Sequence, residues 1–477
     1  MMLRERNLFS NHLISGPRLK QIVRHMTKIF RFAQNNRPGY MKSFTYENQY
    51  LRLADVVEPL WKKSYESQLS MKKHLVEKSM RKVFHILKDQ KLLKIEDNPF
   101  LQTMMTEYGE KMCPVEDTLP SPITKGYRYK NTCNLGPDIK GDRKTLGLYV
   151  GRGYDKTLTC VQPYFLSIIS DRHKQIFKLA QEFLYQSSYE PKFCVEPHGN
   201  WKSVVIRSTT TGQDMVIFLF HPQRNPKEFI DGAKEEILEY FVHGPGKQLD
   251  VDSIYFQSSH RKFPTNDDFP HELLHGIPVL TENLMGSKFQ ISPTSFFQGN
   301  VPCAEVLYSK VLDLGQVGPQ TTVLDICCGT GTIGILAARR AKQVYGVDIT
   351  SQAVEDAKSN AINNGLTNTE FICNKAHRML RELVYSDKLG WDVVAILNPG
   401  RAGANKKLIE SIRNCEKINK VIYISCKPVG NVLSNFVNLI VPPNEIFYGM
   451  PFRPVVTVPV DMFPQTNHCE IIVLFER

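Results

Sequence analysis

The sequence has no Cys-x2-Cys pair and no long apolar run. Zinc ribbons and iron–sulfur clusters use that cysteine spacing to bind their metals, and none of the eleven cysteines shows it. No 18 consecutive apolar residues occur, and the strongest apolar patches, Met215–Phe220 and Ile471–Phe475, have the length of strands. The start of the chain lacks the apolar core of a secretory signal peptide. We therefore expect an intracellular protein with free thiols, no bound metal and no contact with membranes.

Positive charge is concentrated near the start of the chain. Lys and Arg number 60 and Asp and Glu number 48, a difference of +12. Residues 1–150 hold 27 basic and 15 acidic residues and account for the whole excess, because residues 151–477 hold 33 of each. Residues 1–46 alone carry nine basic residues and one acid, Glu5. The basic balance therefore describes one short segment and not a uniformly basic body.

Residues 18–32, within this basic segment, show helical periodicity. Apolar residues recur there with Arg and Lys between them, at Leu19, Ile22, Val23, Met26, Ile29 and Phe30. An amphipathic, Arg-rich and acid-poor segment is typical of a mitochondrial transit peptide, so we expect residues 1–46 to direct the protein to mitochondria. A basic helix lying on RNA or on anionic lipid has the same periodicity and is the alternative. Translation from Met26 or Met41 would remove the signal and give a cytoplasmic or nuclear protein.

Two regions of different character follow. Residues 47–125 indicate a helical region to about residue 95 and then a proline-rich linker. Residues 126–285 mix strand and helix patterns and predict an α+β domain. Within that domain, Ser203–Ser208 and Asp214–Phe220 flank a polar turn and predict a β-hairpin.

Residues 286–477 alternate strands with helices, the pattern of a parallel doubly wound sheet. Apolar strands are expected at Val323–Cys327, Val344–Asp348, Phe371–Cys373, Val393–Leu397 and Val421–Ser425. The predicted fold class is therefore α/β: a C-terminal doubly wound, Rossmann-like domain, an α+β middle domain and a helical N-terminal region.

A glycine loop follows the first of these strands. Gly329, Gly331 and Gly334 have the G-x-G-x-x-G spacing, which lets the backbone leave a strand sharply and approach a ligand closely. Asp348 ends the next strand, 348 − 329 = 19 residues after Gly329. A carboxylate there can accept hydrogen bonds from both ribose hydroxyls of a nucleotide-like cofactor. A structural turn that needs glycine is the alternative.

Two further features favour S-adenosylmethionine over NAD as that cofactor. Asp325 precedes the glycine loop and gives D-x-x-x-G-x-G, the usual arrangement in methyltransferases. The fourth strand ends in Asn398-Pro399. NAD, and hence an oxidoreductase, remains the competing interpretation.

The fifth strand ends in Ser425-Cys426-Lys427-Pro428. The carboxyl end of a parallel strand faces the crevice where such sheets bind ligands, so a thiolate of Cys426 there can act as a covalent nucleophile. Buried packing is the alternative, since it is the commoner use of a cysteine after an apolar strand.

Five motifs taken together resemble the RNA uracil-5-methyltransferases, which make 5-methyluridine in tRNA and rRNA. The motifs are Phe296-x-Gln298, the glycine loop, Asn398-Pro-Gly-Arg401-Ala-Gly403, Ser425-Cys426-Lys-Pro428 and His468-Cys-Glu470. The resemblance is strong over residues 289–477 and weaker over the preceding domain. It implies an S-adenosylmethionine-dependent enzyme that acts on tRNA, with rRNA as an additional or alternative substrate.

The resemblance also implies roles for individual residues. Cys426 would add to uracil carbon 6, and Glu470 would be the base that removes the proton from carbon 5. The cofactor would be held by a larger set, comprising Gln298, Cys327, Gly329, Gly331, Asp348 and Asn398. Phe296 is the expected platform for a base that leaves its stack, and Arg401 would hold a phosphate or the uracil. The competing interpretations are a core aromatic for Phe296 and a capping or ion-paired acid for Glu470.

Two departures from the family pattern bear on activity. Asn398 stands where the family usually has Asp, so a negative charge is absent although hydrogen bonding is retained. Lys427 stands where the family usually has Asn. We expect methylation of uridine carbon 5 in RNA, most simply in the T-loop of tRNA. The alternatives are a catalytically weak or inactive RNA-binding chaperone and an amino-group methyltransferase, which would not need Cys426. The sequence indicates no oligomeric state.

Overall fold

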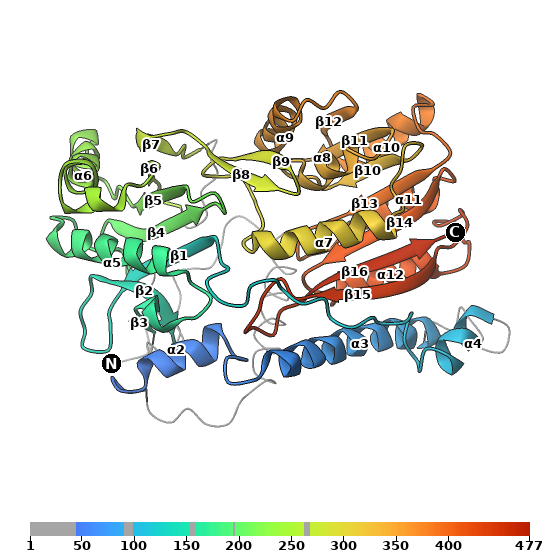
Figure 1. The fold of residues 1–477 in the computed structure, drawn as a ribbon, viewed down its shortest axis with the longest axis horizontal. Helices are drawn as coiled ribbons and strands as arrows, with labels where there is room; N and C mark the ends of the chain where they lie inside the picture. The colour runs from blue at the N-terminus through green and yellow to red at the C-terminus, as the bar shows by residue number, and fades with distance from the viewer. Residues whose placement is uncertain (1–43, 90–98, 152–157, 194–195, 262–267) are drawn as a thin grey trace, which may run out of the picture. The chain divides into compact units, whose positions relative to one another are not determined.

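The computed structural model describes residues 44–89, 99–151, 158–193, 196–261 and 268–477 (Figure 1). Gln49–Arg477 forms one compact unit, and of the other, Met1–Asn48, only the last five residues are described. The expected transit segment, residues 1–46, therefore lies almost wholly outside the described residues. No helix in the described ranges is both long and apolar enough to cross a membrane.

The C-terminal sheet has seven strands in the order β12-β11-β10-β13-β14-β16-β15. Its five parallel strands lie where the apolar runs predict them: β10 (Thr322–Ile326), β11 (Gln343–Asp348), β12 (Thr369–Cys373), β13 (Val393–Leu397) and β14 (Ile418–Ser425). β16 (Glu470–Glu476) and β15 (Arg453–Val460) extend this sheet in the antiparallel sense. The sheet is therefore mixed, with an antiparallel edge that the doubly wound pattern did not predict.

Helices cover both faces of this sheet. One face packs against α7 (Val301–Leu314), α8 (Thr332–Ala338) and α9 (Ser351–Asn363). The other face packs against α10 (Ala376–Tyr385), α11 (Lys406–Arg413) and α12 (Asn431–Ile440). This explains the continuous apolar runs, because a strand covered on both faces buries every side chain, as all five of β13 are buried.

The N-terminal helices also join the C-terminal core. They are α2 (Gln49–Val57), α3 (Tyr65–Asp89) and α4 (Pro99–Thr106). α3 packs against α12 and β15 (Figure 1), and it buries Met80 and Phe84 in the same core as the sheet. The interpretation of the proline-rich stretch as a plain linker was wrong in part, because α4 lies within it. Further along the same proline-rich stretch, Val115 and Leu119 form isolated β-bridges with β15.

Residues 126–285 contain a second seven-stranded sheet, in the order β3-β2-β1-β4-β5-β6-β7. Its strands are β1 (Lys130–Gly136), β2 (Thr145–Val150), β3 (Thr159–Val161), β4 (Trp201–Ser208), β5 (Asp214–Phe220), β6 (Ser253–Ser258) and β7 (Glu272–Gly276). α5 (Asp171–Gln186) and α6 (Lys227–Leu238) pack on it. The predicted hairpin is confirmed, since β4 and β5 pair antiparallel with Ser208 opposite Asp214. A two-stranded hairpin, β8 (Leu280–Leu284) and β9 (Ser287–Ile291), leads to the loop before α7.

Candidate active site

The glycine loop leaves β10 through three residues in the left-handed region. Cys327, Gly329 and Gly331 have φ of 64°, 54° and 77°. That conformation is uncommon for a residue with a side chain, and Cys327 is held in it by its N–H, which donates to the Val347 carbonyl at 2.9 Å. Gly331 then caps α8. The chain thus turns at once from strand to helix at the carboxyl edge of the sheet.

Asp325, on the strand that precedes the glycine loop, holds the loop in place through its side chain. Its side chain is fully buried, and one oxygen accepts the N–H of Gly334 at 2.7 Å. A Cβ at Gly334 would lie only 2.9 Å from that oxygen, so the contact requires glycine. Burial raises the pKa of Asp325 to about 7. Its second carboxyl oxygen is buried and has no partner within the described ranges.

Asp348 lies beside the loop at the end of β11. Its carboxylate accepts the N–H of Gly329 at 3.1 Å and that of Thr350 at 2.9 Å. A carboxylate has lone pairs left after two such bonds, and the space where a Gly329 Cβ would lie is open. A ribose can therefore approach both the bare backbone and the acid. The arrangement fits a nucleotide-like cofactor.

Asn398 and Cys327 complete this side of the edge. The N–H of Asn398 donates to the Ile326 carbonyl at 3.2 Å, which places the end of β13 next to the glycine loop. Both side chains are half-buried. Burial raises the pKa of Cys327 to about 12, so its thiol stays protonated and can line a pocket but is a poor nucleophile.

Cys426 and Glu470 come together across two neighbouring strands. β14 and β16 pair antiparallel, and their last pair is Ser425 with Ile471, so Cys426 and Glu470 are the next residues at this end of the ladder. Burial and then the charge of Glu470 raise the pKa of the half-buried Cys426 thiol. The charge of Arg401 and a hydrogen bond from it act in the opposite direction.

The Glu470 carboxyl is almost fully buried, at 5% exposure. Within the described part of the chain it has no ion pair or side-chain hydrogen bond, so the structure gives no support to a capping or ion-paired acid. Burial raises its pKa to about 8, and the charge of Arg401 opposes the rise. A carboxyl group with a pKa near the working pH is suited to accept and release a proton.

Arg401 links the two reactive groups. It lies exposed on the loop after β13 and acts electrostatically on both Cys426 and Glu470. Burial and four cations (Arg401, Lys72, Lys427 and Arg128) lower the pKa of His468. His468, two residues before Glu470, therefore lies among cations, which favour an anionic substrate nearby.

Phe296 and Gln298 lie on the loop between β9 and α7. Two carbonyls of this loop, from Ser292 and Ser295, accept hydrogen bonds from the buried Arg207 of β4. The Phe296 side chain is 69% exposed, so its interpretation as a core aromatic was wrong. An exposed ring on a held loop is available for stacking.

Gln298 has a partner that the sequence did not reveal. Its side chain is hydrogen-bonded to the hydroxyl of Tyr308, a buried residue of α7. The charges of Glu470 and Asp325 both raise the pKa of that hydroxyl, so Tyr308 is within electrostatic reach of the candidate base and of the acid that holds the glycine loop. Nothing in the sequence distinguishes this tyrosine from other apolar positions of the helix. It became visible only through the fold.

Comparisons with known proteins define the class. The family model for a methyltransferase domain matches residues 318–437. The solved structure of Pyrococcus abyssi tRNA (uracil-54, C5)-methyltransferase, which contains S-adenosyl-L-homocysteine, superposes with a TM-score of 0.61 at 21% identity, covering 87% of this chain and 84% of that one. The fold is that of an S-adenosylmethionine-dependent methyltransferase.

Sequence relatives narrow the class to a family. The chain is 39% identical to mouse tRNA (uracil-5-)-methyltransferase homolog B over 89% of this chain and 86% of that protein. It is 38% identical to the human homolog B over 89% and 84%, and 38% identical to the mouse homolog A over 90% and 70%. The chain belongs to the tRNA (uracil-5-)-methyltransferase family.

Proposed function

We propose that this protein methylates carbon 5 of a uridine in RNA, with the T-loop of tRNA as its substrate, through a covalent adduct on Cys426. The observation that carries the proposal is the placement of Cys426, the residue after β14, next to Glu470 at the start of the paired strand β16, with Arg401 acting on both. Neither an oxidoreductase nor an amino-group methyltransferase has a use for this pair. Family membership supports the same reaction.

The chain's own groups account for the steps on the uracil ring. The Cys426 thiolate adds to carbon 6, which makes carbon 5 nucleophilic. S-adenosylmethionine, when bound, would supply the methyl group that carbon 5 accepts, with its sulfonium sulfur as the leaving group. The Glu470 carboxylate then takes the proton from carbon 5, the bond between Cys426 and carbon 6 breaks, and the ring double bond reforms as the thiolate leaves.

Other residues bind and orient the reactants. Gln298, Gly329, Gly331, Asp348 and Asn398 hold the cofactor, and Cys327 lines its pocket. Phe296 stacks against the flipped base, and Arg401 holds a phosphate or the uracil edge. Asn398 hydrogen-bonds without the charge of an aspartate, which predicts slower chemistry than in relatives with Asp at this position. We assign residues 126–285 to contact with the RNA.

The test is mass spectrometry of nucleosides from T-loop tRNA incubated with the protein and S-adenosylmethionine. We expect 5-methyluridine with the wild type and with Cys373→Ala, which removes an exposed thiol at the end of β12. We expect none with Cys426→Ala. Product from Cys426→Ala would overturn the covalent mechanism.

Failure to form product would point to other substrates or to a loss of turnover. Binding of tRNA and cofactor without 5-methyluridine, followed by product on mitochondrial rRNA fragments, would identify rRNA as the substrate. Binding without product on either RNA would favour an RNA-binding chaperone with a weakened site.

For localisation, we propose that residues 1–46 direct the chain to mitochondria, on the strength of their composition. Residues 1–46 fused to a fluorescent protein should deliver it to mitochondria. Fusions that begin at Met26 or Met41 should remain outside. A full-length fusion confined to the cytosol or nucleus would contradict the proposal.

A further inference from the structure

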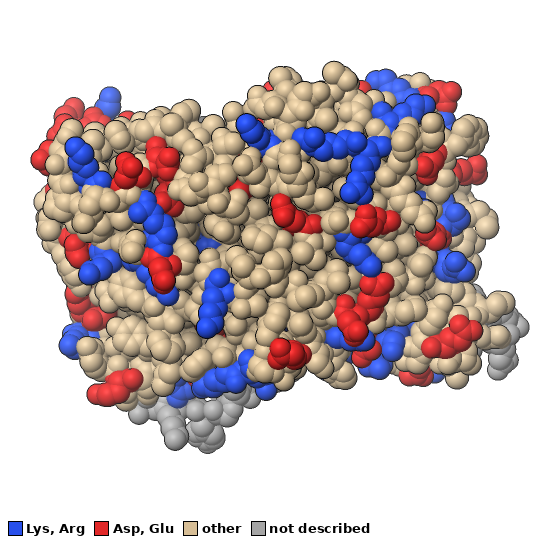
Figure 2. All heavy atoms as spheres, in the orientation of Figure 1, with Lys and Arg blue, Asp and Glu red and all other residues tan. Residues whose placement is uncertain are grey.

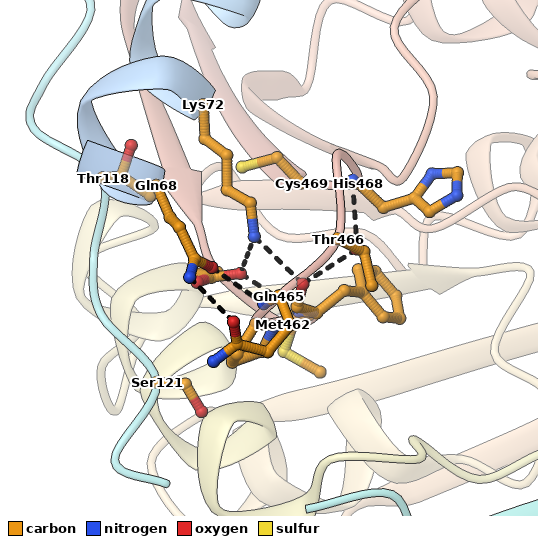
Figure 3. A network of polar contacts seen from close by, with 12 residues as sticks. Gln68, Lys72, Thr118, Ser121, Met462, Gln465, Thr466, His468 and Cys469 are labelled. Atoms are coloured by element: carbon orange, nitrogen blue, oxygen red, sulfur yellow. Dashed lines mark hydrogen bonds and ion pairs between the residues drawn. The ribbon is translucent and has the colours of Figure 1, made fainter. Parts of the chain in front are cut away.

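The loop that leads into Glu470 is held by the N-terminal part of the chain. This loop, residues 461–469, joins β15 to β16 and ends at the candidate base; we call it the β15–β16 loop. Figure 3 shows Lys72 and Gln68 of α3 reaching toward it. These helix residues precede the loop by almost the whole length of the chain.

Lys72 and Asp461 form a buried ion pair. Neither side chain is exposed. The Lys72 ammonium also donates to the Phe463 carbonyl at 3.0 Å. The Asp461 carboxylate that pairs with Lys72 in turn accepts the N–H of Phe463 at 3.2 Å. One lysine therefore fixes two successive points of the β15–β16 loop.

Gln68, one turn earlier on α3, binds the loop at a third point. Its amide donates to the Gln465 side-chain oxygen at 2.8 Å and accepts the Gln465 N–H at 2.8 Å. Gln465 has a φ of 69°, a strained conformation for a residue with a side chain. The Leu60 N–H donates to the Gln465 carbonyl at 2.9 Å. The reciprocal bonds explain how the loop keeps this turn without glycine.

Residues from other elements hold the opposite side of the loop. The Tyr127 hydroxyl donates to the Pro464 carbonyl at 2.9 Å, and the Asn300 amide donates to the Met462 carbonyl at 3.1 Å. The Asp461 N–H donates to the Leu119 carbonyl at 2.9 Å. The β15–β16 loop therefore has little conformational freedom, and Glu470, the residue that follows it, is fixed in position with it.

Stability alone is a poor reason for the buried charges. Desolvating an ammonium and a carboxylate offsets most of their attraction, and apolar residues of similar volume often serve a core equally well. What the pair adds is a directional tether between α3 and the segment before the base. Charges from this region reach the site, because the positive charge of Lys72 contributes to lowering the pKa of His468, two residues before Glu470.

We propose that Lys72 is a positioning residue, which fixes the β15–β16 loop through Asp461 and Phe463 so that the Glu470 carboxylate faces carbon 5 of the covalent uracil adduct. The inference rests on the proposed function, since it concerns the step that follows methyl transfer. Loss of the tether should leave thiolate addition and methylation intact, because Cys426 directly follows β14 and is not part of the β15–β16 loop. It should slow proton removal and release of the product.

The test separates the two steps in a single turnover, with adduct followed on a denaturing gel and 5-methyluridine by mass spectrometry. The variant is Lys72→Met with Asp461→Asn, which removes both charges and keeps an acceptor for the Phe463 N–H. The matched control is Lys73→Met, the next residue of α3, whose pair with Asp117 lies at the surface. Glu470→Gln sets the level of adduct when no base is present.

We expect the double variant to form adduct at close to the wild-type rate and to release product on the order of 10–100-fold more slowly, so that adduct accumulates as in Glu470→Gln. Lys73→Met should behave as wild type. A double variant that melts like the wild type and releases product normally would overturn the inference. So would a parallel loss of adduct and product in proportion to the unfolded fraction. Wild-type protein that gives neither adduct nor product on any RNA would overturn the proposed function instead.

Discussion

Burial raises the pKa of both reactive side chains, and one cation works against the rise. Cys426 follows the end of β14 and Glu470 begins the paired strand β16, and the negative charge of Glu470 adds to the effect of burial on the pKa of the thiol. Arg401 stabilises the thiolate and the carboxylate alike. Full ionisation of the Cys426 thiol therefore requires a higher pH or a bound substrate. The charges around Cys426 should then determine how the rate of adduct formation depends on pH.

The first prediction concerns the rate of adduct formation as a function of pH. Glu470→Gln removes the charge that raises the pKa of Cys426, so the midpoint of the profile should move to lower pH. Arg401→Gln removes the charge and the hydrogen bond that lower that pKa, so the midpoint should move to higher pH. Single-turnover rates of adduct formation across the range measure both shifts. Shifts in the same direction for the two variants would contradict the assignment of opposite effects.

The second prediction concerns stability. The pKa of Glu470 is raised from 4.5 to about 8, so between these values the folded protein keeps a proton that the unfolded chain releases, and stability falls as pH rises. Glu470→Gln carries no such proton. It should raise the free energy of unfolding above pH 8 by several kcal/mol, at about 1.4 kcal/mol for each unit by which the pKa is raised, with no gain below pH 4.5. Denaturant titrations at the two pH extremes test this, and an equal gain at both would contradict it.

Among single residues, the sequence motifs predicted the candidate site residues that lie at strand ends. They did not predict residues whose role depends on a partner far away in the sequence. Cys426, Asp348 and Asn398 each follow an apolar strand, so their common edge was predictable. The burial of Lys72 was not, because its partner Asp461 is separated from it by 389 positions. From the sequence alone, Lys72 is one of many charged residues on a helix of mixed charge, and only the fold shows its pairing with Asp461.

At the scale of elements, the parallel strands could be predicted and the edges could not. Strands covered on both faces give continuous apolar runs, and all five were predicted close to their observed positions. α4 was missed because its first residue, Pro99, counts as a helix breaker in a sequence reading. At the first helical position proline is favoured, since its missing N–H has no partner there in any case.

The third prediction belongs to the glycine loop and uses a matched pair of glycines. Gly329 and Gly365 have φ of 54° and 66°, and neither has an atom within 4 Å of an added Cβ. Gly365 follows α9 at the opposite edge of the sheet. Alanine at either position should cost about 1 kcal/mol, the strain of the left-handed region. Only Gly329→Ala should also weaken S-adenosylmethionine binding by calorimetry, because there the ligand approaches the backbone. Equal affinity in both variants would exclude Gly329 from the cofactor site.

For the whole molecule, the placement of charge matters more than its sum. Residues 47–477 carry a net charge of only about +4, since residues 1–46 hold +8 of the +12. Figure 2 shows basic and acidic side chains interspersed over the face in view. Yet burial and four cations (Lys407, Arg378, Lys375 and Arg381) lower the pKa of His377. These cations lie on α10 and α11 or just before α10, and the start of each of these helices follows the carboxyl end of a strand. These four cations form a second cluster, besides the one that acts on His468, and it therefore adjoins the edge of the sheet that carries Cys426.

The last prediction follows from that placement. RNA bound for catalysis at the carboxyl edge should run its phosphates along this cluster, so Lys407→Gln should weaken RNA binding and reduce the slope of log affinity against log salt by about 1. Lys417 is the control, because it lies just before β14 at the opposite edge, paired with Asp387. Lys417→Gln should leave affinity and slope unchanged. Equal effects of the two substitutions would mean that the RNA responds to the net charge of the protein, and the cluster would then have no part in orienting the substrate.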